Sequence, residues 1–185
     1  SAKTTLNTVL QGAWALLLGH YNDSQDVVFG ITSSGRPTEL PGIENTLGVF
    51  INTLPLRVQW RSATTVDDFL SFLQADNAAM REYEYSSITN IQRWSDWTPG
   101  EEMFSSLLVF ENYPEHNSES SSENGDQGQS LRLEMDVLAH SERTNFGITL
   151  EVQPGDELSV SFDFDTKLYD STLSSRLVAS FEHIL

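Results

Sequence analysis

The segment LGVFINTLPLR, residues 47–57, is the stretch on which the fold class of this sequence depends. Its apolar residues indicate a buried strand, but Asn52 and Thr53 interrupt them, and Pro55 follows two positions later. Proline has no N–H group to donate, so Pro55 is expected to limit strand pairing beyond it. Two interpretations are open at this point: an edge strand whose asparagine bonds to neighbouring backbone, or a strand whose polar pair lines a channel.

Helical spacing of apolar residues recurs on both sides of this segment. Thr5 and Thr65 each precede an apolar stripe, and their hydroxyl groups can cap a helix. Asp67 and Asp68 then fall in a first helical turn, where the helix dipole favours negative charge. We expect helices at residues 5–21, 65–83, 87–94 and 171–185.

The strand signals are short apolar runs in the first two thirds of the chain and strict alternation in the last third. The alternation predicts half-buried antiparallel strands, the final two joined by a turn at Pro154 and Gly155. Together with the helices, this predicts an α+β fold: a mixed, largely antiparallel sheet of about six strands with helices packed on one face. Besides residues 47–57, strands are expected at 26–31, 104–110, 131–137, 146–152 and 158–164.

The composition limits the partners that this chain can have. A net charge of −17 argues against nucleic acid and against anionic membranes, because phosphate binding needs clustered Lys and Arg. No apolar run approaches the roughly 18 residues of a membrane span, and the absence of cysteine fits a cytoplasmic protein. Residues 101–170 hold 16 acidic and three basic residues, which indicates either a solvated face or a surface for a basic partner domain. Within them, the polar stretch 113–130 predicts a mobile acidic loop.

The residues alone reveal no catalytic centre. Nothing matches the Walker or dinucleotide fingerprints, and the serines of GITSSG have the wrong spacing for a nucleophile elbow. The four histidines are scattered, and no pair has metal-ligand spacing. From these patterns we expect no catalytic residue and no metal site in this chain.

Five ordered motifs carry a resemblance to a known family. The chain resembles the C-terminal half of a nonribosomal peptide synthetase condensation domain, and the likeness covers essentially all of it. The most recognisable motif is ELPGIENTLGVFINTLPLRV, residues 39–58, which contains the segment described first. The others are LQGAWALLLGHYNDSQDVVFGITSSGRP (10–37), YEYSSITNIQRW (83–94), SSLLVFENYP (105–114) and ERTNFGITLEVQPGDELSVSFDFDTKLYD (142–170).

The resemblance implies one lobe of a larger enzyme. In that family, two chloramphenicol-acetyltransferase-like lobes face each other across a tunnel, and an acceptor amine attacks a donor thioester to make a peptide bond. The catalytic motif HHxxxDG lies in the N-terminal lobe, and this sequence has no His-His pair. Residues 1–185 are therefore expected to form a C-terminal lobe that is inactive alone. Its implied partners are the N-terminal lobe, peptidyl carrier proteins and adjacent synthetase domains; substrates arrive on phosphopantetheine arms, and no cofactor binds directly.

The resemblance also assigns roles to individual residues. Phe50, Asn52 and Thr53 would line the tunnel, although a buried amide that satisfies neighbouring backbone remains the alternative for Asn52. Arg57 would pair with an acid near the lobe interface, or it is a simple surface arginine. The loop at 33–45 would bridge the two lobes, or it is an ordinary surface loop. Its bridging residues would be Ser34, Gly35, Arg36, Pro37 and Gly42.

Two other functions are compatible with the same motifs. One is a noncatalytic module that binds carrier proteins or neighbouring synthetase domains, and it would gain no activity when an N-terminal lobe is added. The other is the matching lobe of an epimerisation or heterocyclisation domain, although INTLPLR, residues 51–57, is more similar to the condensation type.

Overall fold

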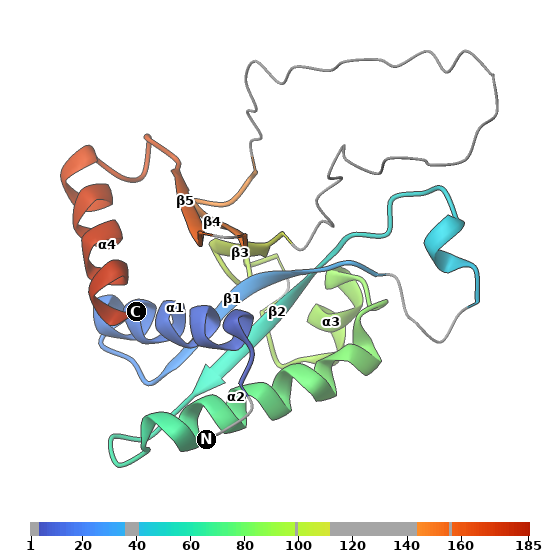
Figure 1. Ribbon diagram of the computed structural model, residues 1–185, viewed down its shortest axis with the longest axis horizontal. Helices are drawn as coiled ribbons and strands as arrows, with labels where there is room; N and C mark the ends of the chain where they lie inside the picture. Colours follow the sequence, from blue (N-terminus) through green and yellow to red (C-terminus); the bar gives the residue numbers. More distant parts are fainter. Residues whose placement is uncertain (1–3, 36–40, 99, 112–143, 156) are drawn as a thin grey trace, which may run out of the picture.

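The structure, a computed structural model, describes residues 4–35, 41–98, 100–111, 144–155 and 157–185 (Figure 1). The strand and the loop expected at 131–137 and 113–130 lie outside these residues. In chain order the elements are α1 (Leu6–Asn22), β1 (Asp26–Ser33), the 3-10 turn η1 (Ile43–Asn45), β2 (Asn52–Gln59), α2 (Val66–Met80), the 3-10 turn η2 (Arg81–Tyr83), α3 (Ile88–Trp94), β3 (Ser106–Phe110), β4 (Ile148–Gln153), β5 (Ser159–Phe164) and α4 (Ser171–Ile184).

Five strands of the described chain form one mixed sheet in the order β2-β1-β3-β4-β5. The outer pairs, β1 with β2 and β4 with β5, are antiparallel, whereas β1 with β3 and β3 with β4 are parallel. The predicted α+β class and mixed sheet are confirmed. The two antiparallel pairings are also the longer ones, whereas the central parallel pairings join segments that are far apart in sequence.

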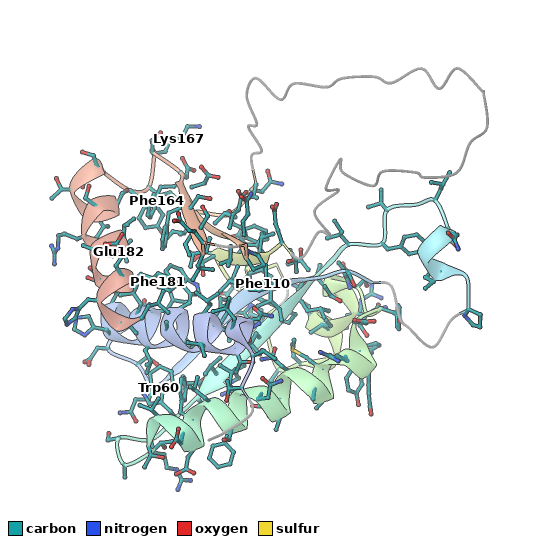
Figure 2. The ribbon with its side chains drawn as sticks, viewed as in Figure 1. Trp60, Phe110, Phe164, Lys167, Phe181 and Glu182 are labelled. Atoms are coloured by element: carbon teal, nitrogen blue, oxygen red, sulfur yellow. The ribbon has the colours of Figure 1, made fainter. Side chains whose placement is uncertain are left out.

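Helix α1 lies at the centre of the fold, with contacts to α2, α4 and β1. Trp14 is completely buried there, and its ring meets Phe162 of β5 and Phe181 of α4 edge-on at centroid distances of 6.2 Å. Figure 2 labels Phe181 on α4, the helix that packs beside α1. The indole Nε1 of Trp14 donates to Ser106 Oγ at 3.4 Å, so the polar edge of the ring also has a partner. This packing places the N-terminal end of α1 beside the end of β1.

Hydroxyl caps fix where the first two long helices begin. The side chain of Thr5 accepts a hydrogen bond from the backbone N–H of Thr8, and Thr65 accepts one from Asp68, as the sequence predicted. None of the described helices is both long enough and apolar enough to cross a membrane.

The segment at 47–57 differs from its prediction in two ways. Its strand begins only at Asn52, and the preceding Leu47 and Val49 are 98% and 95% exposed. The strand also continues past Pro55, which pairs with Gly30 of β1, to Gln59. The expected limit at the proline is wrong because β2 is an edge strand of the described sheet. A proline whose missing N–H faces the free side of an edge strand removes no ladder hydrogen bond.

Candidate functional site

A polar cavity of about 690 Å³ opens where the N-terminal end of α1, the last residues of β1 and the C-terminal end of α2 meet. Polar groups gather there because α1 begins, and β1 and α2 end, at the same edge of the fold. The ends of helices leave backbone N–H and C=O groups without partners in the helix. Its lining includes Thr5, Asn7, Thr8, Gln11, Ser33, Ser34, Gln74, Asn77, Glu84 and Tyr85.

Two pairs of polar side chains join α1 to α2 beside this cavity. The Thr8 hydroxyl donates to Gln74 Oε1 at 2.6 Å, and Asn77 Nδ2 donates to Gln11 Oε1 at 2.6 Å. Thr8 and Gln11 are each only 1% exposed, so these bonds replace water for groups that would otherwise be costly to bury. Thr8 and Gln11 are three residues apart on α1, and Gln74 and Asn77 are three residues apart on α2. Each helix therefore presents its two side chains on one face.

Sequence reasoning missed these four residues as site components. The available signal was that Thr8 and Gln11 occupy two positions, three residues apart, beside the apolar stripe of α1. Recognising their partners required knowledge of how α1 and α2 pack.

Asn7 contributes a further feature of the cavity. Its Oδ1 atom is buried and has no hydrogen-bond partner among the described residues. A buried acceptor without a partner is costly, and an N–H or O–H group in the cavity would satisfy it. The cavity therefore offers hydrogen bonding by amides and hydroxyl groups, with the charged side chains of Arg81, Glu82 and Glu84 at the end of α2. Within the described ranges, no three His, Asp or Glu side chains gather as metal ligands would.

The end of β1 and Leu54 of β2 line one side of the cavity, whereas Phe50, Asn52 and Thr53 are not among its lining residues. Ser33 and Asn52 are the last pair of partners in that antiparallel ladder. The Nδ2 group of Asn52 donates to the backbone carbonyls of Glu84 and Ser86 at 2.8 and 2.9 Å, and its Oδ1 accepts from the N–H of Thr53 at 3.0 Å. This geometry matches the alternative in which a half-buried amide satisfies neighbouring backbone. Asn52 thus fixes the position of Thr53 and of the start of β2.

Gly35 and Phe50 approach each other just beyond this pair. Gly35 is buried with φ +60°, and a Cβ atom on it would clash with the Phe50 carbonyl oxygen. Glycine is therefore required here for both conformation and space. Gly42, with φ +83°, caps η1 and has open space around it, while Ser34 is exposed. Arg36 and Pro37 lie outside the described residues.

Beyond this close approach, residues 41–51 extend away from the sheet (Figure 1). Leu47, Val49 and Ile51 are 98%, 95% and 59% exposed, and we name these three residues the apolar tip. A monomeric protein rarely leaves several large apolar side chains of one segment in water.

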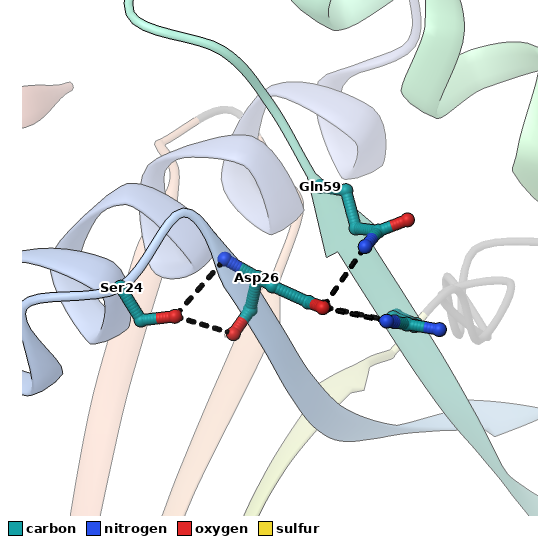
Figure 3. A network of polar contacts seen from close by, with 4 residues as sticks. Ser24, Asp26 and Gln59 are labelled. Atoms are coloured by element: carbon teal, nitrogen blue, oxygen red, sulfur yellow. Dashed lines mark hydrogen bonds and ion pairs between the residues drawn. The ribbon is translucent and has the colours of Figure 1, made fainter.

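Arg57 lies on the other side of the sheet from the cavity, because it alternates with the buried Leu56 and Val58. Its Nε and Nη2 groups donate to the two carboxylate oxygens of Asp26 at 2.8 and 2.6 Å, and Gln59 donates to the same carboxylate at 2.9 Å (Figure 3). The bonds from Arg57 lower the pKa of Asp26, against a smaller opposing effect of burial. Arg57 thus pairs with an acid of its own chain.

Comparison with known proteins agrees with this architecture. The mixed sheet and its helices have the chloramphenicol-acetyltransferase-like α+β fold that solved condensation domains share. The chain belongs to the condensation-domain family, whose model matches residues 1–185.

Its relatives are large synthetases. The chain is 40% identical to one component of linear gramicidin synthase from Brevibacillus parabrevis over 183 residues, which is 99% of this chain and 3% of that protein. It is 42% identical to chondramide synthase cmdD of Chondromyces crocatus over 166 residues, 90% of this chain and 4% of that one. The chain therefore spans a small part of the relatives that it matches.

Solved structures show the same fold at lower identity. The crystal structure of holo T3CT matches with a TM-score of 0.80 and 24% identity, covering 100% of this chain and 41% of that one. The first condensation domain of the calcium-dependent antibiotic synthetase, in complex with substrate analogue 3a, matches with a TM-score of 0.64 and 14% identity. That match covers 96% of this chain and 37% of the other.

Proposed function

We propose that this chain is the C-terminal lobe of a peptide-bond-forming condensation domain of a nonribosomal peptide synthetase. The observation that carries the proposal is how much of a condensation domain this chain matches. The whole chain matches the condensation family, yet it corresponds to only 37% of a solved condensation domain. The sequence also has no HHxxxDG motif, so the catalytic histidines would come from the N-terminal lobe.

In this role the chain supplies one wall of the passage between the lobes. Phe50 and Thr53 would face carrier-bound thioesters, and Asn52 would act through the strand that it holds in place. The bridging residues Ser34, Gly35, Arg36, Pro37 and Gly42 would lead the chain toward the other lobe.

The apolar tip supports the presence of a partner lobe. Leu47 and Val49 are almost fully exposed, although burying each of them would contribute about 1.5–3 kcal/mol. An N-terminal lobe that covers the tip would recover this free energy. Arg57, already paired with Asp26, would contribute at most to the edge of that interface.

The other proposed partners follow from the reaction. Donor and acceptor groups would arrive on the phosphopantetheine arms of carrier proteins, which are substrates and not bound cofactors. We also propose a cytoplasmic location, where the carrier proteins and adjacent synthetase domains would be present.

Reconstitution tests the proposal. The chain is mixed with a separately produced N-terminal lobe that carries HHxxxDG, a donor thioester on one carrier protein and an acceptor on another. Mass spectrometry then follows the dipeptidyl carrier. Product is expected only when both lobes are present, and replacing the second motif histidine with alanine should abolish it.

Two other results would contradict the proposal. Carrier binding by the lone chain, with no product for any N-terminal lobe, would identify a noncatalytic module. An inverted stereocentre or a heterocycle in place of a new peptide bond would identify the epimerisation or heterocyclisation type.

A further inference from the structure

We infer that Glu84 is a positioning residue that binds the end of β1 and the start of β2 and thereby sets the direction in which the apolar tip leaves the sheet. The importance of that direction rests on the proposed function, since the tip would dock against the N-terminal lobe. The contacts themselves are independent of it.

The first contact is made by the side chain of Glu84. Its Oε2 atom accepts a hydrogen bond from Ser33 Oγ at 2.8 Å in a partly buried setting. Ser33 Oγ in turn accepts the backbone N–H of Gly35 at 3.4 Å. A hydrogen bond to a charged carboxylate is stronger than one between neutral groups. Glu84 thus holds the last residue of β1 and, through it, the first turn of the departing chain.

The second contact is made by the backbone of the same residue. The Glu84 carbonyl oxygen accepts Asn52 Nδ2 at 2.8 Å, and the Ser86 carbonyl accepts the same group at 2.9 Å. Asn52 is the first residue of β2 and the ladder partner of Ser33. A single residue therefore binds both members of the terminal pair, one through its side chain and one through its backbone.

Glu84 is itself well placed to act as an anchor. It follows η2, and its N–H bonds to the Arg81 carbonyl at 3.4 Å, so it continues the end of α2. Helix α2 packs on the core through Phe69 and Leu73, which are 7% and 2% exposed. The ends of the two strands are thus connected to the core through a helix that packs on it.

The direction of the apolar tip depends on these contacts at the strand ends, because the side chains of the tip have little packing of their own. Leu47 and Val49 lie in solvent, so their burial cannot fix the course of residues 41–51. A small rotation of the terminal pair would be amplified along the extended segment. Docking of a pre-positioned tip costs less conformational entropy than docking of a mobile one.

Hydrogen–deuterium exchange of the 185-residue chain tests the contact directly. In Glu84→Ala, amides at residues 31–35 and 50–54 are expected to exchange about tenfold faster, as for loss of one charged hydrogen bond. Glu84→Gln keeps an acceptor for Ser33 and should restore most of the protection. Glu82→Ala removes the same charge from the same turn and is the matched control, expected to change nothing.

Two results would overturn the inference at this stage. One is unchanged exchange in Glu84→Ala. The other is uniformly faster exchange that includes β4, which would indicate a general loss of stability. Ser33→Ala should reproduce the local increase in exchange, and Ser34→Ala should not. Glu84→Ala should add little to the effect of Ser33→Ala, because both changes break the same hydrogen bond.

Binding of the N-terminal lobe separates this inference from the proposed function. If the unaltered chain binds that lobe, Glu84→Ala should weaken binding by about tenfold, chiefly through slower association, and Glu82→Ala should not. Equal binding by both variants would overturn the positioning role. If the unaltered chain binds no N-terminal lobe, the proposed function fails, and the exchange experiment still decides whether Glu84 holds the strand ends.

Discussion

Asn52 illustrates how the surroundings of a single amide determine its role. The sequence left two roles open for it. In the structure its Nδ2 group donates hydrogen bonds to two backbone carbonyls. Those carbonyls follow a short 3-10 turn and would otherwise lack a partner inside a partly buried bend. The residue that reads as an interruption of an apolar strand is therefore a connection between β2 and the chain after α2.

Gly35 offers a sharp test at the same scale. We expect Gly35→Ala to reduce the free energy of unfolding by about 2–4 kcal/mol, combining a left-handed φ with a clash at the Phe50 carbonyl. Gly42→Ala is the matched control, since Gly42 also has a positive φ but nothing within 4 Å of an added Cβ. It should cost about 1 kcal/mol. Urea denaturation measures both, and equal effects would contradict the close approach.

Asp26 makes a small contribution to stability that depends on pH. Arg57 lowers the pKa of Asp26 in the folded chain, so its contribution is present above the unfolded value of 3.8 and is lost as pH falls through the lower folded value. Because the pair is exposed, Asp26→Asn should cost less than about 1 kcal/mol at pH 7.

Thermal unfolding between pH 7 and pH 2.5 checks this dependence. The difference between Asp26→Asn and the unaltered chain should shrink toward zero below pH 3.8. Added salt should reduce it at pH 7. Asp163→Asn, on the exposed side of β5, is the control and should show a smaller difference at pH 7. A difference that grows on acidification would contradict the assignment.

At the scale of elements, local patterns predicted most helices and strands. Threonine caps marked the starts of α1 and α2, and alternation marked β4 and β5, because these signals depend on neighbours in sequence. The parallel pairing of β1 with β3 had no such signal. It joins segments separated by β2, α2 and α3, and only tertiary packing decides it.

The same reasoning explains the error at residues 47–51. An apolar run reports that side chains avoid water, but it does not say which chain covers them. Leu47 and Val49 are exposed here, so the pattern that predicted a buried strand would instead describe an interface. The polar pairs between α1 and α2 were missed for a related reason, since each partner lies more than 60 residues from the other.

The contact between Gln11 and Asn77 gives a prediction for the packing of α1 against α2. Gln11→Ala should lower the free energy of unfolding by about 1–3 kcal/mol, because it removes a buried side chain and leaves the partly buried Asn77 amide with Leu73 O as its acceptor. Replacing both residues with leucine should restore part of that loss, since no buried polar group is then left without its partner.

Urea midpoints for Gln11→Leu, Asn77→Leu and the double leucine variant measure this coupling. Asp76→Ala, an exposed neighbour on α2, is the control and should change the free energy of unfolding by less than about 0.5 kcal/mol. Strict additivity of the Gln11 and Asn77 changes would contradict a direct contact.

For the whole molecule, the proposed lobe interface would lie at one edge of the fold. Among the described residues, the core on the helical side of the sheet is packed around the buried Trp14 and Phe181. The polar cavity and the strand ends from which the apolar tip departs lie together at the edge where α1 begins and β1 ends. A lobe that covers the tip would therefore also lie beside the cavity.

Replacing Leu47 and Val49 together with serine tests this arrangement. Both side chains are almost fully exposed, so the free energy of unfolding should change by less than about 0.5 kcal/mol. Binding to the N-terminal lobe should weaken by at least tenfold, or about 1.4 kcal/mol, because two apolar side chains no longer leave water. Phe72→Ser removes a side chain that is 66% exposed on α2 and should leave binding unchanged. Calorimetric titration measures the affinities, and a double variant that binds as tightly as the unaltered chain would show that the apolar tip lies outside the lobe interface.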